Sequence, residues 1–428
     1  MTAPPLEEIG TWRVVLRSFA TLLTGEAAAR LLGLVAILVL ARRLGPHDYG
    51  IVAFAIALVG WFGIVVDSGT ETLTVRDIAR DPSRFRHIAE RVLGLRLAIS
   101  VVATGAFVAG VELFAHGRVR DTVVLFAVAL PAIALNPRWM VLGIREARAI
   151  AVGNICARAV LAAGALLLVH SGADLRRVPF VQATSEVVYA ATILAIVGRR
   201  FGLVRPRIDV PAWISTLRQS APLFVNGVAR AAYYSFDVIA VELLLGPKQA
   251  GIYSVGTKPA LFFAGAFGLF SISFLSSFSA ASAQAPEAAR ELMRHAVKLT
   301  SVVSFPLAGA LSLAAVVIVP AAFGDSYRAA TAVLAVAAWG IPLTGLGVPY
   351  SSVLIAAGRQ ADVMRNHVLA ACVLIVADLI LIPVVGIVGA AAVAAGSAGL
   401  GSWLNFRSCK RAGGAVFGRL PDIEGAAA

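Results

Sequence analysis

Charged side chains inside long apolar stretches are the residues of this sequence that could bind an ionic ligand. A charge at the centre of a membrane helix costs on the order of 2.5–3.5 kcal/mol on insertion scales, so such residues usually face a cavity or a partner. A guanidinium binds two phosphate oxygens at once, whereas an ammonium acts as a point charge. The residues therefore predict a site for an anionic, phosphate-bearing head group: Arg30, Arg230, Lys258, Arg158, Arg138 and Arg96.

Arg30 and Arg230 are the first candidates, because each lies near the middle of its apolar stretch. Glu26 precedes Arg30 by four residues, the favourable order for an ion pair within a helix, so Arg30 could also be structural. Asn226 stands at the corresponding place before Arg230. Lys258 could bind the ligand or extend outward to the surface.

The positions of the other three basic residues are compatible with either a structural role or a ligand-binding role. Arg96 and Arg138 lie a turn or two from the ends of their stretches and could extend to the membrane surface. Arg158 lies about two turns in, so a structural and a ligand-binding role are equally compatible with its position.

Carboxylates inside the apolar stretches point to coupling with an ion gradient. Asp237 and Asp378 are the main pair, Glu26 is a third candidate, and Glu186 is a weaker one. Carboxylates in apolar surroundings bind protons more readily or hold a hard cation. Neutralisation of Arg230 or Lys258 explains the pair equally well. We expect sodium or proton coupling and no cofactor or metal centre, since the sequence has neither a P-loop nor a zinc motif.

Composition identifies the elements that carry these charges. Of 428 residues, 59% are hydrophobic and 14% charged, and the mean hydropathy is +0.85. Soluble proteins are about 45–50% apolar and about 25% charged, so an all-α membrane protein is predicted. A spanning helix needs about 20 apolar residues. About twelve transmembrane helices are expected, at 17–40, 49–67, 90–114, 121–143, 150–170, 178–197, 219–245, 251–277, 297–320, 330–356, 366–384 and 387–405.

The net charge of +13 is explained mostly by topology. If the N-terminus is inside, 23 basic residues fall on the cytoplasmic side and 8 on the opposite side. Cytoplasmic loops carry the excess of Lys and Arg in membrane proteins. We therefore expect a multi-pass protein of the bacterial inner (cytoplasmic) membrane with both termini cytoplasmic, whose basic surface contacts membrane lipids and no nucleic acid.

A repeat divides the chain into two halves. Leu44-Gly45-Pro46 followed by Gly50-Ile51 recurs as Leu245-Gly246-Pro247 followed by Gly251-Ile252, and Ala29-Arg30 recurs as Ala229-Arg230. Parallel repeats are a transporter architecture with the substrate site between the halves, although a Gly-Pro turn could also recur by chance. The predicted domains are a six-helix lobe (1–200), a cytoplasmic linker with an amphipathic segment (201–218), and a second six-helix lobe with a short cytoplasmic tail (219–428). The two parallel repeats would surround a central cavity.

Three segments carry a family resemblance: ARRLGPHDYGI at 41–51, the stretch 222–253 with GPKQAGIY, and DLILIPVVGIVGAA at 378–391. They resemble polysaccharide-biosynthesis flippases of the lipid-linked oligosaccharide (O-antigen) type, within the multidrug/oligosaccharidyl-lipid/polysaccharide exporter superfamily. Asp378 departs from the Asn that is usual in this family. Related lipid II flippases have a cation site built from the corresponding C-terminal helices.

The resemblance implies a function. A flippase of this type moves an undecaprenyl-pyrophosphate-linked oligosaccharide from the cytoplasmic to the outer leaflet by alternating access, for cell-surface polysaccharide synthesis. Its implied partners are the lipid-linked substrate, a polysaccharide polymerase and glycosyltransferases.

Other function classes remain open at this stage. A multidrug/cation antiporter of the same superfamily is expected to have an acidic or aromatic cavity, which the basic residues within the spans disfavour. A membrane-embedded polyprenyl-linked sugar transferase or polymerase needs catalytic residues on sizeable loops, and the outer loops here are short. A scaffold without transport activity does not account for arginines within the spans. We therefore expect a transporter and not an enzyme.

Overall fold

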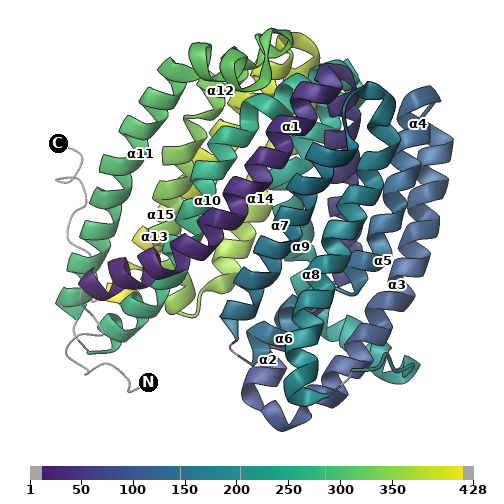
Figure 1. Ribbon diagram of the computed structural model, residues 1–428. Helices are drawn as coiled ribbons and strands as arrows, with labels where there is room; N and C mark the ends of the chain where they lie inside the picture. Colours follow the sequence, from purple (N-terminus) through teal and green to yellow (C-terminus); the bar gives the residue numbers. More distant parts are fainter. Residues whose placement is uncertain (1–11, 145, 203, 285, 418–428) are drawn as a thin grey trace. The chain divides into compact units, whose positions relative to one another are not determined.

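The computed structural model describes residues 12–144, 146–202, 204–284 and 286–417, and this part of the chain contains helices and no β-strand. Figure 1 labels the helices along the chain. The expected all-α fold class is therefore confirmed. Helices satisfy every backbone polar group within their own segment, which is the requirement that a bilayer interior imposes.

The first half of the chain contains long helices joined by short turns. A sharp break replaces the single helix expected over 121–143, because Pro137 has no backbone N–H to continue the preceding turn. The helices are α1 (Trp12–Asp67), α2 (Thr70–Arg80), α3 (Phe85–Phe114), α4 (Gly117–Val123), α5 (Ala129–Ala134), α6 (Arg138–Gly143), α7 (Ala147–Leu168), α8 (Val178–Phe201) and α9 (Val210–Leu245), with 3₁₀ turns at Pro82–Arg84, Val124–Val128 and Gly172–Arg177.

The second half of the chain also contains long helices joined by short turns. The stretch expected as one span over 330–356 consists of two helices that meet near Trp339. The helices are α10 (Pro247–Gln284), α11 (Pro286–Phe323), α12 (Ala330–Ala337), α13 (Gly340–Ala356), α14 (Gln360–Val385) and α15 (Ile387–Phe417), with a 3₁₀ turn at Asp325–Tyr327.

Within the described residues, nine helical segments are long and apolar enough to cross a membrane. One of them, Ala28–Asp67, contains parts of two expected spans, which are separated by a kink at Gly45. The expected spans 219–245 and 251–277 lie in α9 and α10, which are not among the nine. The count of twelve spans stays a prediction.

The chain packs into two compact units. One comprises Gly25–Ser254, and the other comprises Met1–Thr24 with Val255–Ala428. Within the first unit, buried Trp139, Met140 and Phe85 belong to one apolar core. In the second, Phe270, Phe274 and Phe278 follow one another on α10 with ring centroids 5.8 and 5.6 Å apart. Both boundaries between the compact units fall inside helices, in α1 and in α10. The predicted division into lobes 1–200 and 219–428 stays a prediction.

Only the first part of the predicted linker 201–218 is irregular, and the rest is helical. The described residues 202 and 204–209 are non-helical, and α9 begins at Val210, where the Asp209 carboxylate accepts a hydrogen bond from the Ala212 N–H at 3.2 Å. Trp213 Nε1 donates to the carbonyl of Arg91 at 3.1 Å. The expected amphipathic segment is therefore the first part of α9, and it is attached to the start of α3.

Candidate functional site

The repeated Gly-Pro turns have one geometry. Gly45 has φ 74° and ψ 172°, and Gly246 has φ 85° and ψ 174°, a backbone conformation that glycine adopts at little cost. In each copy a proline follows and begins the next helical segment, where its missing N–H has no consequence. The sequence repeat thus corresponds to a structural repeat.

The two turns also contact each other within the unit Gly25–Ser254. A Cβ on Gly50 would overlap the Pro247 carbonyl and lie 2.9 Å from the Gly251 nitrogen. A Cβ on Gly251 would overlap the Pro46 carbonyl in the same way. These close approaches of backbone to backbone explain why both copies carry glycine here.

Measured from these turns, Arg30 and Arg230 are not equivalent. Arg30 precedes Gly45 by fifteen residues, whereas Arg230 precedes Gly246 by sixteen. One residue in an α-helix corresponds to a rotation of about 100°. The counterpart of Arg30 is therefore Ala231, which is buried, while the Arg230 side chain is exposed. The two arginines are thus offset by one residue relative to their turns, and their equivalent placement stays a prediction.

Arg158 lies beside Arg30 instead. Arg30 is half-buried on α1, and Gly33 follows one helical turn later. The Cδ atom of Arg158 on α7 is 3.6 Å from the point where a Cβ on Gly33 would stand, and its Nε is 4.0 Å away. The absence of a side chain on Gly33 thus admits the Arg158 stem next to the turn that carries Arg30. Two predicted ligand-binding residues come together here.

A carboxylate accompanies this pair. Glu186 on α8 is half-buried and interacts electrostatically with Arg158. The amide of Gln182 donates a hydrogen bond to Glu186 Oε1 at 3.1 Å. Ser185 Oγ donates to the buried Ala157 carbonyl at 2.9 Å, which holds α8 against α7 at the residues directly before Glu186 and Arg158. We refer to Arg30, Arg158, Gln182 and Glu186 as the arginine cluster.

Arg96 is in a different environment. Its side chain is 3% exposed and forms an ion pair with Asp67. Arg96 Nε donates to Thr70 Oγ1 at 2.9 Å, and the guanidinium lies 5.6 Å from the Trp139 ring centroid. Arg96 therefore does not extend to the surface, and these contacts favour a structural role that links α1, α2, α3 and α6.

Arg138 lies next to this network. Its side chain is exposed, and Nη1 is 3.7 Å from Glu71 Oε1 on α2. An exposed ion pair of this kind is worth about 0–1 kcal/mol, so it leaves the guanidinium accessible. The ligand-binding role predicted for Arg138 stays a prediction.

Asp237 is buried on α9 at 8% exposure. Its Oδ1 accepts a hydrogen bond from the Val238 N–H at 2.8 Å, and its Oδ2 accepts one from the Tyr253 hydroxyl. Tyr253 is fully buried on α10. Tyr253 ends the GPKQAGIY motif, and the turn at Gly246 brings its hydroxyl back to Asp237.

The remaining predicted residues lie in the second compact unit or outside the described part. Lys258 is half-buried on α10, and Asp378 is completely buried on α14. The side chain of Glu26 lies outside the described residues, so its pairing with Arg30 is not observed. Among the residues that the structure describes, no group of three or more His, Cys, Asp or Glu side chains could hold a metal ion.

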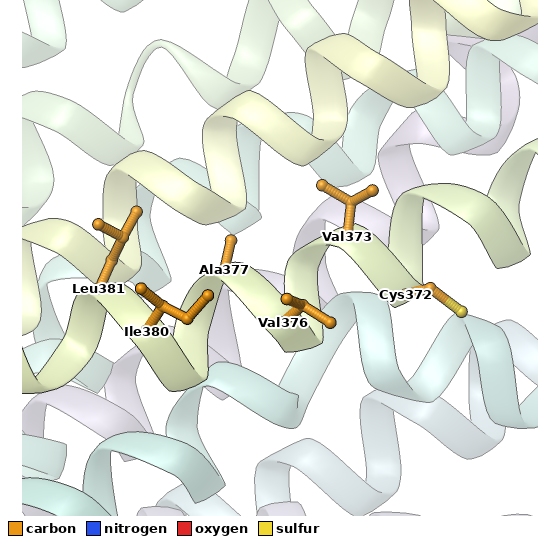
Figure 2. Close-up of a pocket in the computed structure, with 6 residues that line it drawn as sticks. All are labelled: Cys372, Val373, Val376, Ala377, Ile380 and Leu381. Atoms are coloured by element: carbon orange, nitrogen blue, oxygen red, sulfur yellow. The ribbon is translucent and has the colours of Figure 1, made fainter.

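An open groove of about 530 Å³ runs along α14. Figure 2 shows its six lining residues projecting from successive turns of this helix: Cys372, Val373, Val376, Ala377, Ile380 and Leu381. Apart from the thiol of Cys372, the lining is hydrocarbon. The groove therefore lacks the donors that a phosphate-binding site requires, and it is not the candidate site.

Comparison with known proteins gives consistent matches. The sequence model of a family described as polysaccharide biosynthesis protein matches residues 15–272. A protein of Escherichia coli (strain K12) described as "Putative O-antigen transporter" is 22% identical over 229 residues. That alignment covers 52% of this chain and 55% of the relative, so it spans about half the length of each protein.

Several solved structures of membrane transport proteins share this fold. An inward-facing multidrug resistance MATE family transporter of the MOP superfamily matches with TM-score 0.73 at 13% identity, over 89% of this chain and 94% of that one. The lipid II flippase MurJ in an inward closed conformation matches with TM-score 0.70 at 14% identity, over 92% and 87%. A MOP superfamily transporter from Pyrococcus furiosus matches with TM-score 0.63 at 12% identity, over 96% and 98%. The fold is therefore that of a multi-pass membrane transporter.

Proposed function

Because this chain belongs to the polysaccharide biosynthesis protein family, we propose that it is a flippase for a lipid-linked oligosaccharide. In this proposal an undecaprenyl-pyrophosphate-linked oligosaccharide moves from the cytoplasmic to the outer leaflet of the bacterial inner membrane by alternating access. The O-antigen transporter relative and the fold shared with a lipid II flippase support it. The protein would act as a transporter and would catalyse no bond-forming step.

The arginine cluster is the observation that carries the proposal. Two guanidinium groups, Arg30 and Arg158, lie on neighbouring helices inside apolar segments. A pyrophosphate carries the charge that two such groups neutralise, and each guanidinium can bind phosphate oxygens bidentately. The sugars need only polar or aromatic walls, and the polyprenyl tail would stay in the lipid. Arg230, in the same compact unit, would contribute further positive charge.

Coupling to an ion gradient is proposed for the buried carboxylates Asp237 and Asp378. Asp237 already accepts two hydrogen bonds, from Val238 and Tyr253, which hold its two carboxylate oxygens in place. A charged carboxylate in an apolar helix can take up a proton or hold a sodium ion through oxygen ligands. Both termini would be cytoplasmic. Glycosyltransferases and a polysaccharide polymerase would be the partner enzymes of the transport step.

The proposal is tested with Arg30→Ala and Arg158→Ala in cells that depend on this protein for surface polysaccharide. We expect lipid-linked oligosaccharide to accumulate in the cytoplasmic leaflet and surface polymer to fall roughly tenfold or more, because losing one charge-assisted contact costs about 1.5–3 kcal/mol. Arg120→Ala, which removes an exposed arginine in the last turn of α4, is the control. Normal export by both variants at normal protein levels contradicts the phosphate-binding role.

A cation antiporter is the second candidate, because the MATE family transporter shares the fold. The arginine cluster disfavours it, since positive charge next to the ligand repels a cationic drug. Lower sensitivity of expressing cells to cationic dyes, together with unchanged polysaccharide export in the Arg158→Ala strain, would support this candidate instead.

A further inference from the structure

The C-terminal part of α15 carries an exposed stripe of one aromatic and three basic side chains. Trp403, Arg407, Lys410 and Arg411 stand at positions i, i+4, i+7 and i+8 of the helix, a spacing that places them on one face. All four residues are exposed, Trp403 by 49%. We refer to them as the basic stripe. The proposed function assigns these residues no role.

The opposite face of the same turns fixes the helix to its neighbours. Asn366 Nδ2 on α14 donates to Asn405 Oδ1 at 2.9 Å and to Ser408 Oγ at 3.0 Å. Cys409 Sγ donates to the Tyr350 carbonyl on α13 at 3.3 Å. The three α15 residues in these contacts are buried. The basic stripe is therefore presented outward from a firmly packed helix within one compact unit.

The length of α15 places the stripe at the edge of the hydrocarbon. The helix begins at Ile387 and has 31 residues, whereas about 20 residues are enough to cross a hydrocarbon core that is about 30 Å thick. Counted from Ile387, that length ends near Phe406. Trp403 thus lies at the boundary, where tryptophan is enriched in membrane proteins. The three cations follow it, at the depth of the lipid headgroups.

The positive charges of the stripe are not balanced by carboxylates. The Arg407 guanidinium lies over the Trp403 ring, 5.2 Å from its centroid. Within the described part of the chain, no ion pair joins the stripe to an acidic side chain. The start of α14 differs, because Arg359 and Arg365 both pair with Asp362 there. The stripe therefore has a net charge that a negative ligand can neutralise.

We propose that the basic stripe binds the headgroup of an anionic phospholipid at the membrane surface where α15 ends. Basic clusters that directly follow a membrane helix attract acidic lipids. The guanidinium groups can bind phosphate oxygens bidentately, the ammonium adds a point charge, and the indole ring packs beside the upper acyl chain. A zwitterionic lipid is bound less well, because its own cation is repelled. The ligand is a bilayer lipid, so the inference goes beyond the proposed function and does not depend on the cargo.

Quenching of Trp403 fluorescence by brominated lipids tests this site. The full-length chain is reconstituted in equal mixtures of phosphatidylglycerol and phosphatidylcholine, with bromine on the acyl chains of one lipid or the other. The Trp403 signal is the difference between each protein and its Trp403→Phe form. Bromine quenches only rings that it contacts, so the signal reports the neighbouring lipid. We expect phosphatidylglycerol to occupy this position roughly tenfold more often than phosphatidylcholine.

Substitutions in the stripe should remove this preference through their charge. A triple variant with Arg407→Gln, Lys410→Gln and Arg411→Gln should be quenched equally by the two lipids. Arg407→Lys keeps the charge and should keep most of the preference. High salt should weaken the preference of the wild type, because these charges are exposed and are screened.

The matched control removes three exposed charges from the other compact unit, by Arg80→Gln, Arg84→Gln and Arg199→Gln. It should retain the preference of the wild type. Equal quenching of the wild type by both lipids, or quenching by neither, overturns the proposal, because the stripe then meets unselected lipid, water or protein. A preference that persists in the triple variant overturns it as well. Should the triple variant not reconstitute, Arg407→Gln and Lys410→Gln must each lower the preference when they are measured singly.

Discussion

At the scale of residues, the membrane-embedded charges divide by the partners they have. Arg96 is buried, paired with Asp67 and covered by Trp139, so a ligand could reach it only by breaking that network. Arg158 is exposed on α7, and its Cδ atom lies 3.6 Å from the point where a Cβ on Gly33 of α1 would stand. Arg96 and Arg158 both occur in similar apolar sequence. Arg158 is the better ligand-binding candidate because its side chain is exposed, whereas Arg96 is buried in an ion pair.

Asp237 and Tyr253 form a second residue-scale unit, for which we predict a role in ion coupling. Asp237→Asn should blunt the dependence of export on an imposed sodium or proton gradient, because an amide neither takes up a proton at neutral pH nor carries the charge that holds a cation. Tyr253→Phe keeps the carboxylate and removes only the hydroxyl donor. It should therefore retain gradient dependence with a lower rate.

The measurement is transport into membrane vesicles under imposed gradients of each ion, at matched protein levels. Full gradient dependence of the Asp237→Asn variant would show that coupling occurs elsewhere, and Asp378 would be examined next.

At the scale of elements, the two Gly-Pro turns determine how the helices of the repeat approach each other. Their prolines begin helical segments, and their glycines at 50 and 251 bring backbone against backbone. Close helix approach through small residues is a common packing mode in membranes, where apolar burial does not drive association. The turns thus have a packing role in addition to reversing the chain.

Gly50→Ala should therefore destabilise the protein strongly. The added methyl group overlaps the Pro247 carbonyl, and backbone cannot move aside as a side chain can. Overpacking typically costs about 1–3 kcal/mol or more, which should lower the melting temperature of the detergent-solubilised protein by several degrees. Gly60→Ala is the matched control, because a Cβ there meets nothing within 4 Å. Equal melting temperatures for the two variants would argue against the close contact.

At the scale of the whole molecule, charge distribution sets the orientation in the membrane. The cytoplasmic excess of basic residues, 23 against 8, is spread over all the expected inner segments. This spread matters because orientation follows the Lys and Arg of short loops near the helix ends. The net charge of +13 is accordingly a consequence of topology more than of ligand binding.

We predict from this distribution that both ends of the chain lie in the cytoplasm. A fluorescent protein fused after residue 428 should fluoresce, because such proteins fold in the cytoplasm. Alkaline phosphatase fused after His116, in a loop expected outside, should be active because it forms its disulfides only there. Activity in the reverse pattern would invert the orientation and with it the direction of transport.

The sequence alone determined the fold class, the approximate spans and the family. These follow from local properties, because a lipid interior admits only long apolar helices that satisfy their own backbone. The repeated Gly-Pro turns were also visible, since each is a contiguous motif whose backbone conformation requires glycine.

Only the tertiary structure decided which charges meet. In helices that are apolar on every side, periodicity says little about which face meets which neighbour. The approach of Arg158 to Gly33, the Asp237–Tyr253 hydrogen bond and the burial of Arg96 depend on contacts between helices. The residue types predicted a cationic site, and helix packing places Arg158 next to the turn of α1 that carries Arg30.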